Sequence, residues 1–382
     1  MIRVFADDLT GAAELAGICK EHALNPLLTV VPTAANHAEA IVYCTDSRSM
    51  DLADALKTTK QFLAPISIAK EELVYKKTDS VLRGYIVEEL LLQMKHLGYD
   101  RVLFIPENPS MGRIISKGQY FVNGKLLSDT AFAHDPEFPR KTADVVDILA
   151  GQGADIHVLQ YGDALPATGI IVGEASCKED LEEWASRIDH GMMLAGGGDF
   201  FQAILEQRYG NSVPTLLSPP QQPYLYISGT SFKASVSFIQ SLVDESGMVH
   251  YIDAQLLEGI GLQAWLANCS RALEENQRAV VAFDPSLQVQ TLYSALFLRK
   301  KMASIISALL PMTNIGEIMI EGGSTAKAIL DELDLPYWVP DAVIGRGVVR
   351  MQDAHQQYAI TLKPGSYPLP DFILSLFPIN HQ

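Results

Sequence analysis

The chain has 382 residues, of which 48% are hydrophobic and 19% are charged, and its formal net charge is -16. This length exceeds the roughly 100–200 residues of a typical domain, so it predicts two domains, each with a core of its own. The strong negative charge argues against a nucleic-acid groove or an anionic membrane surface, because both are bound through basic patches.

Short apolar runs alternate with helical patterns through the first half of the chain. Strands are expected at residues 3–5, 41–44, 73–75 and 102–105, and helices at 51–63 and 88–97. This alternation is typical of βαβ units and predicts a largely parallel sheet flanked by helices. The helix at 88–97 has Gly98 as its stop signal, and Asp79 and Ser80 precede it as candidate caps.

A proline-rich run divides the chain. Residues 214–223 contain four prolines in ten positions, which neither a helix nor a central strand can accommodate. We therefore expect a first domain at 1–215 and a second at 216–382. Beyond the run a second α/β pattern appears, with strands expected at 224–227, 279–283, 318–320 and 358–362 and helices at 232–243 and 326–333. The sequence thus predicts an α/β protein of two domains, each with a largely parallel sheet flanked by helices.

The loops that follow the expected strands are the candidate binding sites, because ligands of parallel α/β sheets bind beyond the carboxyl ends of strands. Asp7 and Asp8 follow the first strand. One carboxylate could cap the next helix, but the second has no evident structural role. The Asp-x-Asp-x-Thr pattern of aspartyl-nucleophile phosphatases fits Asp8 and Thr10, but Ala6 stands where the nucleophile belongs.

Basic residues recur after the later strands of the first half. They are Arg48, Lys76, Lys77, Arg83 and Arg113. Each could be an ordinary surface charge, but together they would give an acidic protein the local positive charge that a carboxylate or phosphate needs. Because successive strand residues face opposite ways, we expect only one of the two lysines to enter the site.

Two loops of the second half combine glycine with hydroxyl residues between a strand and a helix. The residues concerned are Ser228, Gly229, Gly322, Gly323, Ser324 and Thr325, and Lys363 and Gly365 follow the last strand. Glycine lets backbone amides approach a phosphate, and a helix N-terminus adds partial positive charge. Neither loop fits the P-loop or the dinucleotide fingerprint. The run 196–198 is either a further phosphate loop or a flexible turn.

In their order along the chain, these segments resemble the four-carbon acid sugar kinase family. The resemblance is carried by residues 6–12, 77–84 and 363–365, with 120–124 and 129–136 between them. It implies a first domain that binds a sugar acid such as threonate or erythronate, and a second that binds ATP with Mg²⁺ on its phosphates. On this interpretation Asp8 is the first candidate for the catalytic carboxylate and Asp79 the second.

The resemblance also implies the binding residues. It places Asp8, Arg48, Lys77, Asp79, Arg83 and Arg113 in the substrate site. Asp7 and Lys76 are further candidate substrate contacts by their position in the same loops, and the carboxylate of the acid would be held by Arg48, Arg83 or a lysine. The resemblance places Ser228, Gly322, Gly323, Ser324, Thr325 and Gly365 in the nucleotide site, to which the loop pattern adds Gly229 and Lys363. Domain closure would then align the terminal hydroxyl of the acid with the γ-phosphoryl group.

Two other functions remain open at this point, a non-catalytic sensor of nucleotide and acid and, with less support, a phosphatase. The four cysteines show no paired spacing and the nine histidines no metal-ligand spacing, so neither a disulfide framework nor a protein-held metal is expected. No targeting segment is apparent, and a cytoplasmic protein with a small-molecule partner is expected. Homo-oligomerisation is left open by the sequence.

Overall fold

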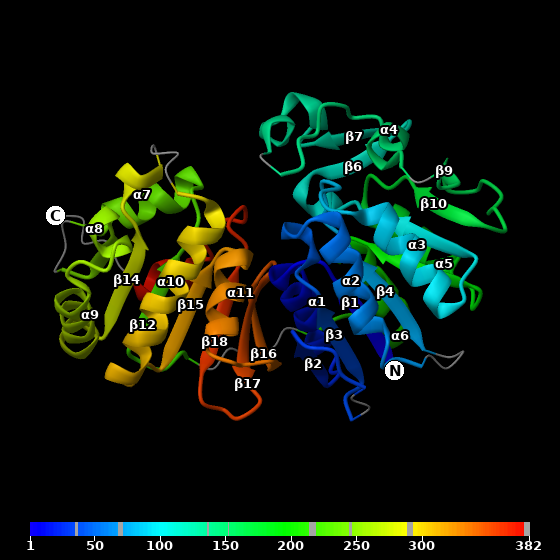
Figure 1. Cartoon of the computed structure of the whole chain (residues 1–382). Helices are drawn as coiled ribbons and strands as arrows, with labels where there is room; N and C mark the ends of the chain where they lie inside the picture. Colours follow the sequence, from blue (N-terminus) through cyan, green and yellow to red (C-terminus); the bar gives the residue numbers. More distant parts are fainter. Residues whose placement is uncertain are drawn as a thin grey trace. The chain divides into compact units, whose positions relative to one another are not determined.

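The computed structural model of the chain describes residues 1–34, 37–67, 72–135, 137–151, 153–213, 219–243, 247–288 and 293–377. The chain divides into two compact units, Met1–Pro214 and Thr215–Gln382. The expected boundary between residues 215 and 216 lies in segment 214–218, outside the described residues, as does Pro136. Each unit is an α/β structure with a mostly parallel sheet, which confirms the expected fold class (Figure 1).

The described strands of unit 1 form a parallel sheet in the order β2-β3-β1-β4-β11-β5-β10-β9. Their bounds are β1 Ile2–Ala6, β2 Pro26–Thr29, β3 Ala40–Cys44, β4 Leu73–Lys77, β5 Arg101–Ile105, β9 Ile156–Leu159, β10 Gly169–Gly173 and β11 Met192–Gly196. Every residue of β1, β3 and β4 is buried, as expected for parallel strands covered on both faces.

The order of the strands reverses at β1. From β1 the chain runs through α1 to β2 on one side, and from β3 it runs through α2 to β4 on the other. Strand β1 therefore pairs with β3 on one edge and with β4 on its other edge. Such a reversal opens a crevice at the carboxyl ends of the central strands, which is where open α/β sheets bind ligands.

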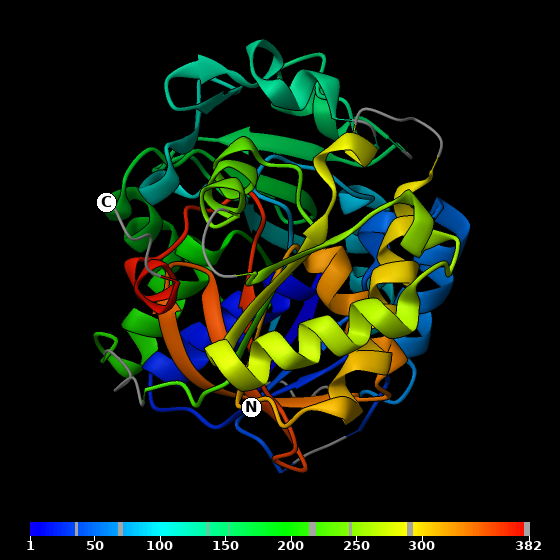
Figure 2. The same cartoon turned by 90° about the vertical axis from the view of Figure 1, so that its left-hand side faces the viewer.

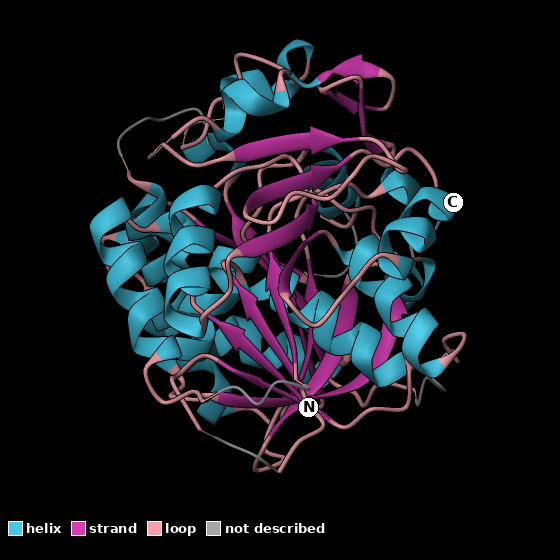
Figure 3. Cartoon of the chain, turned by 90° about the vertical axis from the view of Figure 1, so that its right-hand side faces the viewer, coloured by secondary structure: helices cyan, strands magenta, loops and turns pink. Residues whose placement is uncertain are grey.

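The helices of unit 1 pack on the strands (Figure 3). Their bounds are α1 Leu9–Glu21, α2 Leu52–Leu63, α3 Ile86–Leu97, α4 Val145–Leu149, α5 Lys178–Ser186 and α6 Gly198–Tyr209. The expected caps of α3 are wrong: its N-cap is Tyr85, because Asp79 is held by other partners in the preceding loop. No helix in the described ranges is long and apolar enough to span a membrane.

A small antiparallel sheet follows β5 and was not expected from the sequence. It consists of β6 Arg113–Ser116, β7 Gln119–Val122 and β8 Lys125–Leu126, and short 3-10 turns at Leu127–Asp129 and Ala131–His134 follow it. This segment contacts the loop after β4, since the hydroxyl of Tyr120 donates a hydrogen bond to the carbonyl of Ser80. The sheet thereby helps to fix that loop.

The described strands of unit 2 form a sheet in the order β13-β14-β12-β15-β18-β17-β16, parallel except for β17, which pairs antiparallel with both β16 and β18. The bounds are β12 Tyr224–Ser228, β13 Val249–Ile252, β14 Arg278–Phe283, β15 Glu317–Glu321, β16 Tyr337–Gly345, β17 Val348–Asp353 and β18 Ala359–Lys363. The helices are α7 Lys233–Ser241, α8 Ala254–Leu257, α9 Leu262–Asn276, α10 Ala295–Leu309, α11 Gly323–Glu332 and α12 Asp371–Leu376. Figure 2 shows α9 lying across this sheet.

Candidate active site

The acidic turn after β1 has a structural role as well as a chemical one. Asp8 is the N-cap of α1: its Oδ1 accepts the amide of Gly11 at 3.2 Å, and its Oδ2 accepts the hydroxyl of Thr10 at 2.7 Å. Asp7 takes no part in the cap. Its carboxylate is 4% exposed and receives both Nε and Nη2 of Arg48, at 3.0 and 2.7 Å. The two aspartates therefore have different partners.

A single guanidinium joins the loops after β1, β3 and β4. Besides Asp7, Arg48 reaches Asp8 Oδ1 at 3.0 Å and Asp79 Oδ1 at 3.4 Å. Burial alone would lower the pKa of Arg48, but the three carboxylates raise it well above its ordinary value. Arg48 is thus permanently charged and holds the aspartates together at the point where the strand order reverses.

Asp79 is bound on both of its oxygens. It receives Nε and Nη2 of Arg83 at 3.0 and 2.9 Å, and its Oδ2 also accepts the amides of Val81 and Arg83. Burial would raise the pKa of Asp79, but Arg83 and then Arg48 hold that pKa well below its usual range. Arg83 in turn reaches Asp135 at 3.2 Å. The side chains of Asp79 and Arg83 therefore have all their charged atoms engaged with partners inside the protein.

Asp8 is the most accessible of the three carboxylates. Its side chain is 20% exposed, against 4% for Asp7 and 8% for Asp79. Burial would raise the pKa of Asp8, but the charges of Arg48 and Lys77 outweigh burial and keep that pKa below its ordinary value. Asp8 is therefore an ionised carboxylate at neutral pH, with a face that a ligand can reach.

The two adjacent lysines separate as strand alternation predicts. Lys77 lies beside the acidic turn, donating to the carbonyl of Thr78 at 3.1 Å and pairing with Glu14 of α1 at 3.4 Å. Lys76 points away from the cluster and pairs with Glu89 of α3 in the interior. Glu14 was not identified from the sequence, although a buried-type position occupied by a carboxylate between alanine, leucine and glycine residues of α1 is a recognisable signal.

Two further arginines contact the loop after β4. Arg113, at the start of β6, donates to the hydroxyl of Ser80, and Arg140 donates to the carbonyl of Leu82. Arg140 was missed by the sequence analysis because it follows no strand of the parallel sheet.

The glycine run at 196–198 is a tightly packed turn. A Cβ on Gly196, whose φ is +148°, would lie 1.9 Å from the carbonyl oxygen of Ile105, and a Cβ on Gly197 would lie 2.4 Å from Oδ1 of Asn108. These glycines let the turn after β11 pack against the loop after β5. Close packing explains the run without a phosphate.

In unit 2 a buried carboxylate organises the candidate nucleotide residues. Glu321, at the end of β15, is fully buried and accepts Lys363 Nζ at 2.6 Å and the hydroxyls of Ser228, Ser235 and Tyr226 at 3.0, 2.5 and 2.5 Å. Lys363 is itself only 1% exposed. Ser228 and Lys363 therefore belong to the framework beneath the loops.

The glycine loops of unit 2 converge above this framework. A Cβ on Gly229 would lie 1.9 Å from Oγ1 of Thr325, and one on Gly365 would lie 2.8 Å from Oγ1 of Thr230. Helix α11 begins at Gly323 with Gly322 as its N-cap, so no cap side chain covers the amides of its first turn, which includes Ser324. Uncovered amides at a helix N-terminus suit a phosphate group.

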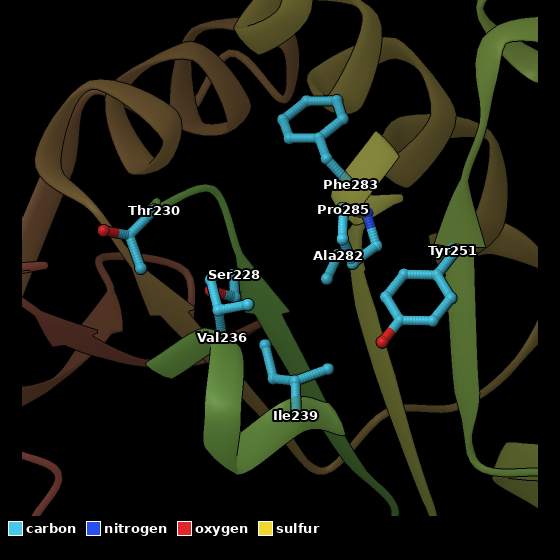
Figure 4. A pocket seen from close by; sticks show the side chains of 8 residues that line it. All are labelled: Ser228, Thr230, Val236, Ile239, Tyr251, Ala282, Phe283 and Pro285. Atoms are coloured by element: carbon cyan, nitrogen blue, oxygen red, sulfur yellow. The ribbon is translucent and has the colours of Figure 1, made fainter. Parts of the chain in front are cut away.

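An open pocket adjoins the loop after β12 (Figure 4). It is lined by Ser228, Thr230, Val236, Ile239, Tyr251, Ala282, Phe283 and Pro285. The Thr230 side chain lies on one side and the Tyr251 ring on the other, with the aliphatic side chains between them. The aromatic and aliphatic side chains of this lining, with hydroxyls at its edge, are of the kind that contacts a flat apolar group. Its apolar lining has no sequence signature.

The described residues contain no group of three or more His, Cys, Asp or Glu side chains arranged to hold a metal ion.

Comparison with known proteins places this site in a family context. Residues 2–204 match the model of the sugar-binding N-terminal domain. A D-threonate kinase of Salmonella typhimurium is 31% identical over 195 residues, a match that covers 47% of this chain and only 46% of that protein. A 3-oxo-tetronate kinase of Pseudomonas fluorescens is 23% identical over 411 residues, covering 97% of this chain and 95% of the relative.

The fold is shared with a solved structure. A crystal structure of a Haemophilus influenzae protein of the DUF1537 family superposes with a TM-score of 0.74 at 19% identity, covering 98% of both chains. The likeness extends through both units and concerns the fold.

Proposed function

The chain belongs to the four-carbon acid sugar kinase family, and from this premise we propose that it transfers the γ-phosphoryl group of ATP to a hydroxyl of a four-carbon sugar acid. The acid would be of the threonate, erythronate or 3-oxo-tetronate type named for its relatives. The observation that carries the proposal is the cluster in which Arg48 joins Asp7, Asp8 and Asp79 at the reversal of strand order. The cytoplasm, where ATP is abundant, is the proposed setting.

Asp8 is the proposed acceptor of the hydroxyl proton. Phosphoryl transfer depends mainly on positioning and charge neutralisation, with a carboxylate orienting the attacking hydroxyl. Asp8 is ionised, exposed on one face and fixed in direction by Arg48 and Thr10. Asp79 is the weaker candidate because Arg83 and two backbone amides already bind its oxygens.

Unit 2 is proposed to hold the nucleotide. The amides at the start of α11 and the loops around Gly229 and Gly365 would bind its phosphates, and the pocket beside Tyr251 and Phe283 would take the base. Glu321 would serve this site indirectly, by fixing the strand ends from which the loops emerge. Mg²⁺ on the phosphates would supply charge neutralisation in such a reaction.

The direct test is coupled ADP release with Mg-ATP over a panel of D- and L-threonate, D- and L-erythronate and 3-oxo-tetronates. We expect at least one acid to support turnover, and Asp8→Asn to abolish most of it. Binding of both ligands without ADP release would identify a non-catalytic sensor instead. Silence across the panel, together with no thermal shift by ATP, would refute the kinase proposal.

A further inference from the structure

Two arginines beside the candidate acid site have no carboxylate partner among the described residues. Arg113 is 9% exposed, and its guanidinium donates to the neutral hydroxyl of Ser80. Arg140 donates to a backbone carbonyl, and its Nε is buried without a hydrogen-bond partner. Because neither guanidinium is hydrogen-bonded to a carboxylate of the described residues, both keep donors for an anion that arrives with a ligand.

The other arginines of the site are already neutralised. Nε and Nη2 of Arg48 donate hydrogen bonds to Asp7 and Asp8, and Nη1 lies 3.4 Å from Asp79 Oδ1. The three guanidinium nitrogens of Arg83 all donate hydrogen bonds, Nε and Nη2 to Asp79 and Nη1 to Asp135. A substrate carboxylate that bound either guanidinium would have to displace a well-placed carboxylate of the protein. Both arginines are better suited to holding the aspartates in place.

Charge is distributed unevenly over the cluster. Its cationic members are Arg48, Lys77, Arg83, Arg113 and Arg140, and its anionic members are Asp7, Asp8, Glu14, Asp79 and Asp135. The two sets are equal in number, yet the unpaired positive charge lies on the side of Arg113 and Arg140. The accessible negative charge lies on Asp8. A molecule with a carboxylate at one end and hydroxyls at the other matches this polarity.

We propose that the carboxylate of the sugar acid binds to Arg113 and Arg140, and that Arg48 and Arg83 are positioning residues for the aspartates. This inference rests on the proposed function for the identity of the ligand, and it gives Arg140 a role in binding. It replaces the expectation that Arg48, Arg83 or a lysine holds the carboxylate. The charge of Arg113 already acts on the neighbouring Asp79, where it helps to lower the pKa of that carboxyl.

The experiment compares an acid with its uncharged analogue. Threonate or erythronate and the corresponding tetritol are titrated calorimetrically into the wild type and into Arg113→Gln and Arg140→Gln, and KM and kcat are measured for the same pairs. A hydrogen bond to a charged group contributes about 1.5–3 kcal/mol, so each variant should weaken acid binding about 10- to 150-fold. Binding of the tetritol and the KM for ATP should change less than about threefold, a shift below 1 kcal/mol.

Arg187→Gln is the matched control. Like Arg140, Arg187 donates to a backbone carbonyl, that of Asp163, lies over an aromatic ring and has a buried nitrogen without a partner. It lies outside the acid cluster, at the end of α5. Its substitution should leave acid binding unchanged, so a general effect of removing a half-buried arginine is separated from the loss of an anion partner.

The outcomes are distinguishable. If the variants lose affinity equally for the acid and for the tetritol, the arginines merely support the loop after β4, and the proposal is overturned. Acid affinity equal to that of the wild type in both variants would overturn it as well. Should Arg113→Gln fail to fold, Arg113→Lys and Arg140→Gln decide the question. If the wild type binds the acid but releases no ADP, the kinase proposal fails while the titrations still judge the carboxylate assignment. Absence of acid binding in the wild type would overturn both.

Discussion

Replacing Asp8 by Asn separates the structural role of this residue from its proposed chemical role. The Oδ1 atom that accepts the amide of Gly11 at 3.2 Å and Nη2 of Arg48 at 3.0 Å is retained in Asn, whereas Oδ2, which accepts the hydroxyl of Thr10, becomes an NH2 group and the negative charge is lost. Asn is as good an N-cap as Asp, so the helix start should survive. The charged hydrogen bond to Arg48 becomes a neutral one, at a cost of about 1 kcal/mol.

The kinetic loss should be much larger than the structural one. A general base contributes about 10²–10⁴-fold in rate, so kcat should fall by that factor. A cost of about 1 kcal/mol lowers the melting temperature by about 2–4 °C for units of this size. The KM for ATP should be unchanged, because the proposed phosphate-binding loops surround Gly229, Gly322 and Gly365.

The assay is steady-state ADP release with the preferred acid, combined with thermal melting of the same samples. Asp79→Asn is the informative comparison, because Asp79 is the second candidate for the same role. Turnover of Asp8→Asn within tenfold of the wild type would refute the assignment of Asp8. A selective loss of kcat in Asp79→Asn would transfer the role to Asp79.

Three further predictions follow from single contacts. Gly229→Ala would place a Cβ 1.9 Å from Oγ1 of Thr325, so the loop must move, and we expect the KM for ATP to rise about tenfold or more while the KM for the acid is kept. Asp79 has a lowered pKa, so it stabilises the fold above the unfolded pKa of about 3.9, and this contribution is lost as pH falls through the lower folded pKa. In urea titrations Asp79→Asn should therefore lower the free energy of unfolding by about 1–3 kcal/mol at pH 7 and by progressively less towards pH 2. An equal decrease at both pH values would contradict this. Glu107 is fully buried, and burial raises the pKa of its carboxyl group well above the usual range. The free energy of unfolding should therefore decrease as pH rises from about 4.3, the pKa in the unfolded chain, towards the higher folded pKa. Glu107→Gln should remove this loss and be more stable than the wild type at pH 8, as measured by urea unfolding; a decrease would show that the carboxylate is charged in the fold.

The parallel strands and their functional loops were predictable because their signals are local. An apolar run such as residues 41–44 identifies a buried strand, and a charged residue just after it falls at the carboxyl edge of the sheet by topology alone. That reasoning placed Asp8, Arg48 and Asp79 in one neighbourhood before any contact was known. It also separated Lys76 from Lys77 through strand alternation.

The pairing of charges was not predictable, because it depends on contacts between residues distant in the chain. Asp79 reads as a helix cap in the sequence but is bound by Arg83 and Arg48. Lys363 reads as a phosphate ligand, yet it is neutralised by Glu321, which is 42 positions away. Short antiparallel strands such as β6 escaped notice because β6 is only half-buried and lacks the continuous apolar run that identifies the parallel strands.

The small sheet of β6, β7 and β8 has a consequence for how the family can diversify. Through Arg113 and Tyr120 it holds the loop that carries Asp79, although it is no part of the parallel sheet that supplies Asp8 and Arg48. Substitutions in this appended segment can therefore reshape the surroundings of a bound acid without disturbing the core strands. If the proposed acid site is correct, exchange of residues 113–140 between relatives should alter the preference for the acid while the core strands stay unchanged.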